Sequence, residues 1–102
     1  MKPTAILVNA SRGSVVDQKA LYEALERNQI RGAAIDVTEE EPIPADDPLL
    51  TLDNIIITPH IGTQTEETGV KMSVLAVENL LAGLKGETVP NCVNCHLIGK
   101  NI

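Results

Sequence analysis

The sequence predicts an α/β fold: a partial doubly wound parallel sheet of three strands with two main helices, the second of them long and C-terminal. Short apolar runs at 5–8, 32–37 and 55–57 are typical of strands buried in a parallel sheet. Amphipathic helical patterns cover about 18–27 and about 66–85. The first strand, the first helix and the second strand fit a βαβ unit with a right-handed crossover.

Both predicted helices have recognisable ends. Asp17 is a suitable N-cap for the first helix, and Asn28 tolerates the left-handed backbone that ends a helix. The first helix has one apolar face, formed by Ala20, Leu21, Ala24 and Leu25. The second helix has a broader apolar stripe, which predicts burial on more than one side, and Gly86 ends it.

We expect residues 1–86 to form the α/β part of the chain and residues 87–102 to form an irregular tail. Between the second and third strands, 38–48 contains three prolines and five acidic residues, which predicts a loop. Three leucines after this loop predict a short turn that packs inward: Leu49, Leu50 and Leu52.

The composition excludes several classes of partner. The chain has 102 residues and a formal charge of −6, which fits one small domain and argues against nucleic-acid or acidic-membrane binding. Tyr22 is the single aromatic residue, so no base-stacking platform is available. The sequence has neither a signal-peptide pattern nor an apolar run of about 18 residues. We therefore expect a cytoplasmic protein without a nucleic-acid or membrane partner, and we assign no metal ligand among its candidate site residues.

Polar side chains follow each of the three predicted strands. Asn9 and Arg12 follow the first strand, Asp36 and then Glu41 follow the second, and His60 follows the third. The carboxyl ends of parallel strands meet at one edge of a sheet, where open α/β proteins bind ligands. We therefore expect these side chains to converge on one crevice.

These groups together suit the reduction of a 2-oxo acid. Histidine is the usual general acid near neutral pH, and a carboxylate partner would fix its tautomer. Arg12 would hold the carboxylate of the substrate with a bidentate grip and polarise its carbonyl group. Hydride would attack C2 while His60 protonates the developing alkoxide.

Each residue also has a plainer interpretation. Arg12 could lie on the surface of a strand-to-helix turn, and His60 could cap a strand. Any one glutamate of an acidic loop, Glu41 included, is usually solvated. Asp36 is harder to explain in this way, because a carboxylate at a buried strand end normally has a partner or a ligand.

Three motifs in register resemble a known family. They are Ile-Leu-Val-Asn-Ala-Ser-Arg-Gly-Ser-Val-Val-Asp at 6–17, Ala-Ala-Ile-Asp-Val at 33–37 with Glu41-Pro42, and Asn-Ile-Ile-Ile-Thr-Pro-His-Ile-Gly at 54–62. Over about 3–94 the chain resembles the C-terminal part of the Rossmann-like NAD(P)-binding domain of D-isomer-specific 2-hydroxyacid dehydrogenases. It is most similar to the glyoxylate/hydroxypyruvate reductase subgroup, which implies NAD(P)-dependent reduction of a small 2-oxo acid.

The resemblance also implies roles for individual residues. Arg12 would be the substrate-binding catalytic arginine, His60 the proton donor and Glu41 its paired carboxylate. Glu41 is chosen over the two glutamates before it because a proline follows it. Asp36 would meet the nicotinamide carboxamide. The cofactor, NAD or NADP, would be bound by Asn9, Ala10, Arg12, Asp36, His60 and Gly62.

A phosphate-binding feature of this family is absent from the 102 residues. They contain no Gly-x-Gly-x-x-Gly turn, which holds the pyrophosphate in dinucleotide-binding domains. We therefore expect a fragment, whether a truncated product, an alternative isoform or an incomplete gene model, that alone binds the cofactor weakly or not at all and has negligible turnover. The alternative is a non-catalytic truncated isoform that docks onto a full-length relative as a homo- or heterodimer.

The tail contains a motif that is not part of the resemblance to this family. Cys92-Val-Asn-Cys95-His96 matches the Cys-x-x-Cys-His pattern of c-type haem attachment. Because the sequence lacks an export signal and the tail is irregular, we prefer a weak zinc site or an incidental cysteine pair.

Overall fold

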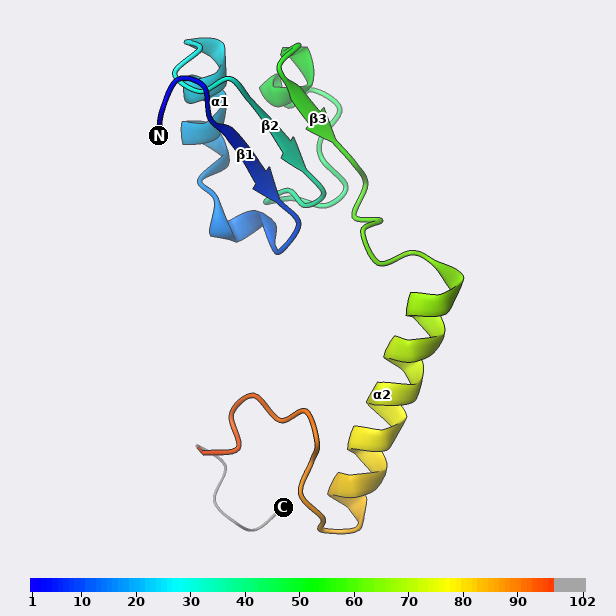
Figure 1. Ribbon diagram of the computed structural model, residues 1–102. Helices are drawn as coiled ribbons and strands as arrows, with labels where there is room; N and C mark the ends of the chain where they lie inside the picture. The colour runs from blue at the N-terminus through cyan, green and yellow to red at the C-terminus, as the bar shows by residue number, and fades with distance from the viewer. Residues whose placement is uncertain (97–102) are drawn as a thin grey trace. The chain divides into compact units, whose positions relative to one another are not determined.

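The computed structural model describes residues 1–96, and the rest of the predicted tail lies outside the described residues. The chain divides into two compact units, Met1–Gly62 and Thr63–Ile102 (Figure 1). The predicted boundary at residue 86, between an α/β part and a tail, stays a prediction.

The first unit contains a three-stranded parallel sheet in the order β1-β2-β3. Its strands are β1 (Ile6–Asn9), β2 (Gly32–Ile35) and β3 (Ile55–Ile57). The arrows point the same way in Figure 1, so the three carboxyl ends share one edge. The predicted α/β class and parallel sheet are confirmed, and each strand ends within two residues of its expected position.

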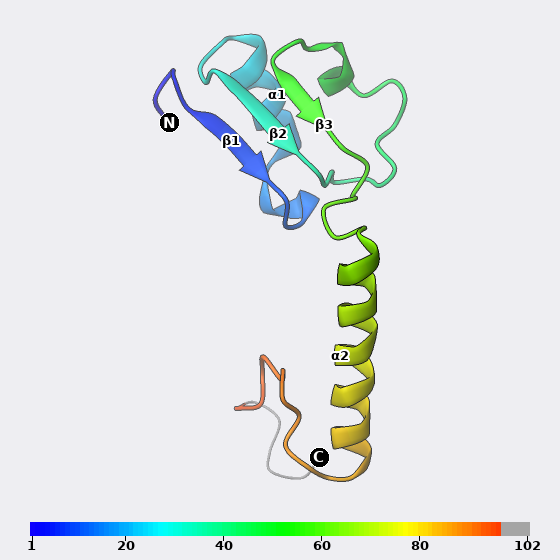
Figure 2. The same ribbon diagram turned by 45° about the vertical axis from the view of Figure 1, so that its right-hand side comes forward.

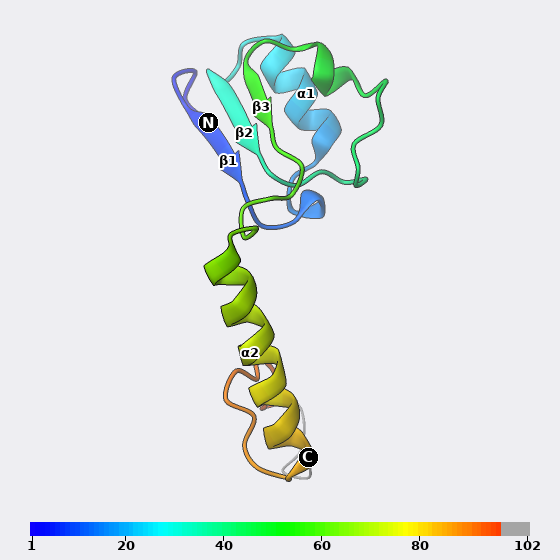
Figure 3. The same ribbon diagram turned by 90° about the vertical axis from the view of Figure 1, so that its right-hand side faces the viewer.

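Helix α1 (Gln18–Glu26) covers one face of this sheet (Figures 2 and 3). It begins where the sequence predicts, because the Asp17 side chain accepts the Ala20 N–H at 2.9 Å as an N-cap. It ends before Asn28, whose φ of 52° lies in the left-handed region. Local capping chemistry therefore sets both ends of α1.

The core of the first unit lies between α1 and the sheet. Its buried members are Leu21, Leu25, Ile30, Ala33, Ile35 and Leu49. Leu49 is fully buried in a short 3₁₀ turn, Pro48–Thr51, at the predicted place, and Leu52 packs against the core. Leu50 is 48% exposed, so the prediction that it packs inward is wrong. The Asp47 side chain caps this turn by accepting the Leu49 N–H at 2.9 Å.

The opposite face of the sheet carries exposed apolar side chains. Ile6, Val8 and Ile56 are 58%, 72% and 67% exposed. Within residues 1–62 no helix covers this face (Figure 3). The expectation that the first strand is buried on both faces is therefore not met within residues 1–62, where only the α1 side of the sheet has a packing partner.

The second unit is built on helix α2 (Glu66–Leu84), close to the predicted 66–85. The Thr65 hydroxyl accepts the Thr68 N–H at 3.2 Å and caps the helix, and Gly86, with φ of 70°, follows its end. Of the residues in α2 only Ala82 is buried. The predicted burial of the apolar stripe is therefore not observed among the described residues. None of the helices in residues 1–96 has the length and apolar character needed to cross a membrane.

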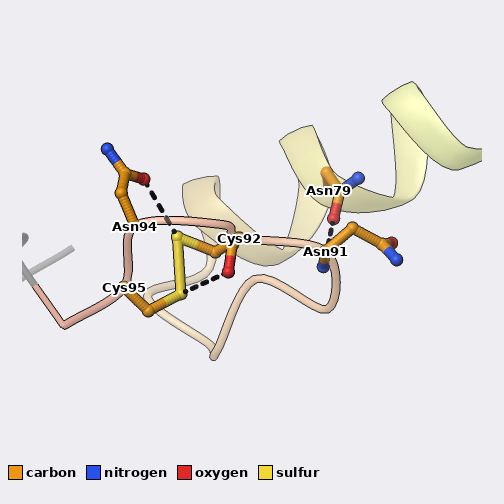
Figure 4. Close-up of a disulfide and its surroundings, with 5 residues drawn as sticks. All are labelled: Asn79, Asn91, Cys92, Asn94 and Cys95. Carbon is orange, nitrogen blue, oxygen red and sulfur yellow. Dashed lines mark hydrogen bonds between the residues drawn. A yellow bond between two sulfur atoms is a disulfide. The ribbon is translucent and has the colours of Figure 1, made fainter. Parts of the chain in front are cut away.

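The described part of the tail returns to α2. The Asn91 N–H donates to Asn79 Oδ1 at 3.1 Å, and a disulfide joins Cys92 to Cys95 (Figure 4). The sequence analysis did not predict this bond. Nowhere in residues 1–96 are three or more His, Cys, Asp or Glu side chains grouped so as to hold a metal ion, so the zinc interpretation finds no support there.

A close backbone contact in the first unit leads to a prediction about stability. A Cβ atom on Gly13 would overlap the backbone carbonyl group of Thr38, in the loop after β2. We expect Gly13→Ala to lower the free energy of unfolding by about 1–3 kcal/mol in urea denaturation, as overpacking does. Gly69→Ala in α2 is the control, because no atom lies within 4 Å of its Cβ position. Equal losses in the two variants would show that the Gly13 contact is unimportant.

Candidate active site

The polar side chains predicted from the sequence lie at the carboxyl edge of the sheet. Asn9 ends β1, Asp36 directly follows β2, and His60 comes shortly after β3. Glu41 reaches the same edge from the loop after β2 and contacts His60 there. All of these residues belong to the first unit.

The Glu41 and His60 side chains form a hydrogen-bonded pair. Glu41 Oε2 lies 2.8 Å from His60 Nδ1, while Glu41 Oε1 accepts the Thr38 N–H at 3.2 Å. The bond to His60 and then the Thr38 N–H, with a contribution from the charge of Arg12, hold the pKa of Glu41 below its ordinary value. The two side chains are 46% (His60) and 39% (Glu41) exposed, so a ligand can reach the pair from solvent.

Glu41 is the one of three consecutive glutamates that contacts His60. Glu39 instead accepts the Gln18 N–H at 3.0 Å, and Glu40 offers its backbone carbonyl to the Thr38 hydroxyl at 2.6 Å. The contact that a catalytic Glu41 requires is therefore present. Its catalytic role stays a prediction.

Asp36 organises the segment after β3. One carboxylate oxygen accepts the Thr58 hydroxyl and the Ile61 N–H, at 2.9 Å for the amide, and the other accepts the Gly62 N–H at 2.8 Å. The Thr58 hydroxyl, followed by the two amides, lowers the pKa of Asp36 below its ordinary value. The partner expected for this carboxylate is thus a neighbouring loop of the protein. A Cβ atom on Gly62 would lie 3.0 Å from Asp36 Oδ2, so glycine permits this approach.

His60 lies in a strained backbone conformation within that segment. Its φ of 55° lies in the left-handed region, which a histidine adopts seldom. Its N–H donates to the Thr58 carbonyl at 3.0 Å, and Asp36 accepts hydrogen bonds from Thr58 before it and Ile61 after it. Such strain persists where surrounding contacts impose it, and it is frequent at functional sites.

Asn9 shapes the turn that carries Arg12. Asn9 is buried, and its Nδ2 donates to the Arg12 carbonyl at 2.9 Å while its Oδ1 accepts the N–H and hydroxyl of Ser11. The Arg12 side chain is exposed, and its Nη1 donates to the Ser11 carbonyl at 2.6 Å. Ala10, also exposed, lies between them at the sheet edge. Asn9 thus acts on the backbone, and the guanidinium keeps further donors for a ligand.

A pocket of about 340 Å³ opens beside the Glu41–His60 pair. Asp36, Glu41 and His60 line its polar side. Its apolar side is formed by Pro42, Ile43, Leu50, Ile57 and Pro59. This volume lies at the small end of the range for ligand pockets, and the mixed lining suits a small molecule with one polar end.

Sequence reasoning missed the residues that hold this site together. The Thr38 N–H donates to Glu41, the Thr58 hydroxyl donates to Asp36, and the Gln18 side chain accepts the Glu39 N–H. These bonds hold the loops that carry Glu41 and His60. A threonine at a strand end is too common to stand out, and the partners are distant in sequence. The sole usable signal was the general rule that a buried carboxylate has a partner.

The lowered pKa of Asp36 predicts a pH dependence of stability. A carboxylate with a lowered folded-state pKa stabilises the fold above its ordinary pKa, and this contribution is lost as pH falls toward the lowered value. In urea denaturation we expect Asp36→Asn to be less stable than the wild type at about pH 7, with a difference that shrinks below about pH 4. Asp46→Asn, at an exposed loop position, should behave as the wild type. A difference that does not change with pH would contradict this role of Asp36.

Comparison with known proteins agrees with this geometry. The family model for the NAD binding domain of D-isomer specific 2-hydroxyacid dehydrogenases matches residues 1–62. A glyoxylate reductase of Korarchaeum cryptofilum is 54% identical over 98 residues, which cover 96% of this chain and 30% of the relative. A probable 2-ketogluconate reductase of Dictyostelium discoideum is 53% identical over 98% of this chain and 30% of its own length. The chain thus spans about 30% of the length of these curated relatives.

A solved structure shows the same fold. The NADPH-dependent glyoxylate/hydroxypyruvate reductase of Sinorhizobium meliloti, in complex with NADP and malonate, is similar with a TM-score of 0.71 at 41% identity. The similarity covers 78% of this chain and 25% of that one. Since the family model matches more than half of the chain and includes the whole candidate site, the chain belongs to the family of D-isomer specific 2-hydroxyacid dehydrogenases.

Proposed function

We propose that this chain supplies the catalytic edge of an NAD(P)-dependent reductase for small 2-oxo acids of the glyoxylate/hydroxypyruvate type. The observation that carries the proposal is the 2.8 Å contact between Glu41 Oε2 and His60 Nδ1 at the carboxyl edge of the sheet. Arg12, Glu41 and His60 are the proposed catalytic residues. Because the chain spans about 30% of its relatives, the activity is proposed for this segment within their complete fold.

His60 is the proposed proton donor. Glu41 accepts a hydrogen bond from His60 Nδ1 and so orients the imidazole ring. Because Nδ1 contacts Glu41, we assign proton transfer to His60 Nε2. The proton goes to the substrate oxygen on C2, where negative charge develops during reduction. A positioned general acid of this kind typically contributes about 10²–10⁴-fold to the rate.

Arg12 is the proposed binding group for the substrate carboxylate. Its side chain is exposed at the same edge, and its charge is close enough to help lower the pKa of Glu41. A guanidinium has five N–H donors in a planar fork, and Nη1 uses one for the Ser11 carbonyl. The others suit a bidentate grip on a carboxylate.

The residues beside this edge fit the nicotinamide end of NAD or NADP. A carboxylate has about four acceptor positions, and the Asp36 carboxylate uses three of them for protein groups, which leaves one for a carboxamide N–H. Asn9, Ala10 and Gly62 are the other proposed contacts, together with Arg12 and His60. When bound, the reduced nicotinamide supplies the hydride for C2. The location predicted from the sequence, the cytoplasm, stays a prediction.

The test grafts this chain into a relative. The 98 aligned residues of the Korarchaeum cryptofilum glyoxylate reductase would be replaced by those of this chain. We expect the grafted enzyme to reduce glyoxylate with NADH or NADPH, and His60→Ala to lower kcat/KM by about 10²–10⁴. Glu41→Gln should lower kcat, and Arg12→Ala should raise KM for glyoxylate.

Glu40→Gln is the matched control for Glu41→Gln, because it removes the same charge from the neighbouring position and leaves the His60 contact in place. Circular dichroism and NADPH binding would establish that each variant is folded. A folded His60→Ala enzyme with the kcat/KM of the parent graft would refute the proposed proton donor.

A second candidate function is non-catalytic docking onto a full-length relative or a second copy. The exposed sheet face supports it, since Ile6, Val8 and Ile56 form an apolar surface beside the open edge of β1. We expect the tagged chain to co-purify with a co-expressed full-length relative, and Val8→Lys to abolish this. Val15→Lys is the control, since Val15 is similarly exposed but lies outside the sheet. Retention by Val8→Lys would exclude this face as the contact.

A further inference from the structure

The start of α1 and the loop after β2 are joined by a reciprocal pair of hydrogen bonds. The Gln18 backbone N–H donates to Glu39 Oε1 at 3.0 Å, and the Glu39 backbone N–H donates to Gln18 Oε1 at 3.0 Å. Gln18 also donates from Nε2 to Asp47 Oδ2 at 2.8 Å. We call the two reciprocal bonds the Gln18–Glu39 clamp. The clamp ties the first residue of α1 to the loop that carries Glu41.

The residue next to the clamp is held from several sides. Thr38 is buried, and its carbonyl group lies against the backbone of Gly13 so closely that no side chain fits between them. Its hydroxyl donates to the Glu40 carbonyl at 2.6 Å. The peptide group between Thr38 and Glu39 is therefore fixed by Gly13 and by the clamp on Gln18.

The preceding peptide group, between Val37 and Thr38, contacts the Glu41 carboxylate. The Thr38 N–H donates to Glu41 Oε1 at 3.2 Å, and the second oxygen, Oε2, is thereby presented to His60 Nδ1 at 2.8 Å. Both side chains of this pair are partly exposed, so burial does not immobilise them. The backbone of the loop therefore contributes to the position of Glu41.

We propose that Gln18 and Glu39 are positioning residues, which hold the turn at 38–41 so that Glu41 is preorganised for its contact with His60. The inference rests on the proposed function, because it assigns a purpose to the Glu41–His60 pair. Catalytic groups gain from being held by neighbours whose own positions are fixed, since small misplacements are costly. Neither residue touches substrate or cofactor in this scheme.

A purely structural role for the clamp makes a different prediction. Glu39 accepts one of the N–H groups that the first turn of α1 leaves unpaired, so it could serve to stabilise the helix start alone. In that case removal of Glu39 would lower stability and would also remove a negative charge near Glu41. Loss of a like charge favours ionisation, so the pKa of Glu41 would fall further.

The experiment measures the pKa of Glu41 in the full 102-residue chain, from the side-chain ¹³C carboxyl shift against pH by NMR. The variants are Gln18→Ala, Glu39→Ala and the control Glu40→Ala. Arg12 and His60, which also act on Glu41, remain in all of them. We expect the pKa of Glu41 to rise toward its ordinary value in the first two variants, because the contacts that lower it are loosened. In Glu40→Ala it should stay low or fall.

The sign of the shift decides the proposal. An unchanged or lowered pKa of Glu41 in folded Gln18→Ala and Glu39→Ala would overturn it and leave the clamp as a helix-capping contact. If an alanine variant fails to fold, Gln18→Asn, whose side chain is shorter by one methylene, carries the same expectation. Glu39→Gln keeps the acceptor and should restore the low value. The titration involves no turnover, so its outcome is separate from that of the grafted reductase.

Discussion

The carboxylate of Asp36 is the interaction on which the rest of the candidate site depends. It stands at the end of β2 but accepts hydrogen bonds from Thr58, Ile61 and Gly62, all of which follow β3. The chain is thereby folded back around the strand end, with His60 inside the loop at a φ of 55°. A three-residue strand could not by itself aim a side chain three residues beyond its end. The hydrogen bonds of Asp36 fix the backbone around His60 relative to the end of β2. They thereby set the direction of the His60 side chain.

The start of α1 has a comparable role on the other side of the edge. Gly13 brings the turn after β1 into contact with the Thr38 backbone, and Gln18 binds Glu39 in the same loop. The loops that carry Arg12 and Glu41 are therefore joined through one helix terminus. The site depends on backbone contacts between segments at the carboxyl edge of the sheet. The apolar core of the first unit, by contrast, lies between α1 and the sheet. Substitutions at Gly13 or Asp36 should accordingly change stability and site geometry together.

The features that were predictable from the sequence are those with local causes. Asp17 and Asn28 mark the ends of α1 through capping chemistry that involves neighbouring residues. The convergence of Asp36, Glu41 and His60 on one pocket was predictable too, because it follows from parallel strands, but Asn9 and Arg12 do not line that pocket. The partners of Asp36 were not, because the need for a hydrogen bond does not identify a donor more than twenty residues away. The exposed Val8 shows a further limit, since an apolar pattern indicates which face can be covered without showing what covers it.

Two ionised carboxylates place negative charge at the sheet edge. Thr58, Ile61 and Gly62 keep Asp36 ionised, and His60 and Thr38 do the same for Glu41. In the proposed reductase, an anionic 2-oxo acid that approaches this edge would meet both negative charges. Arg12 offsets the charge of Glu41, whose pKa it helps to lower. Since Arg12 is exposed, salt should weaken its attraction for the substrate more than it weakens the Glu41–His60 contact, which separates substrate binding from proton transfer.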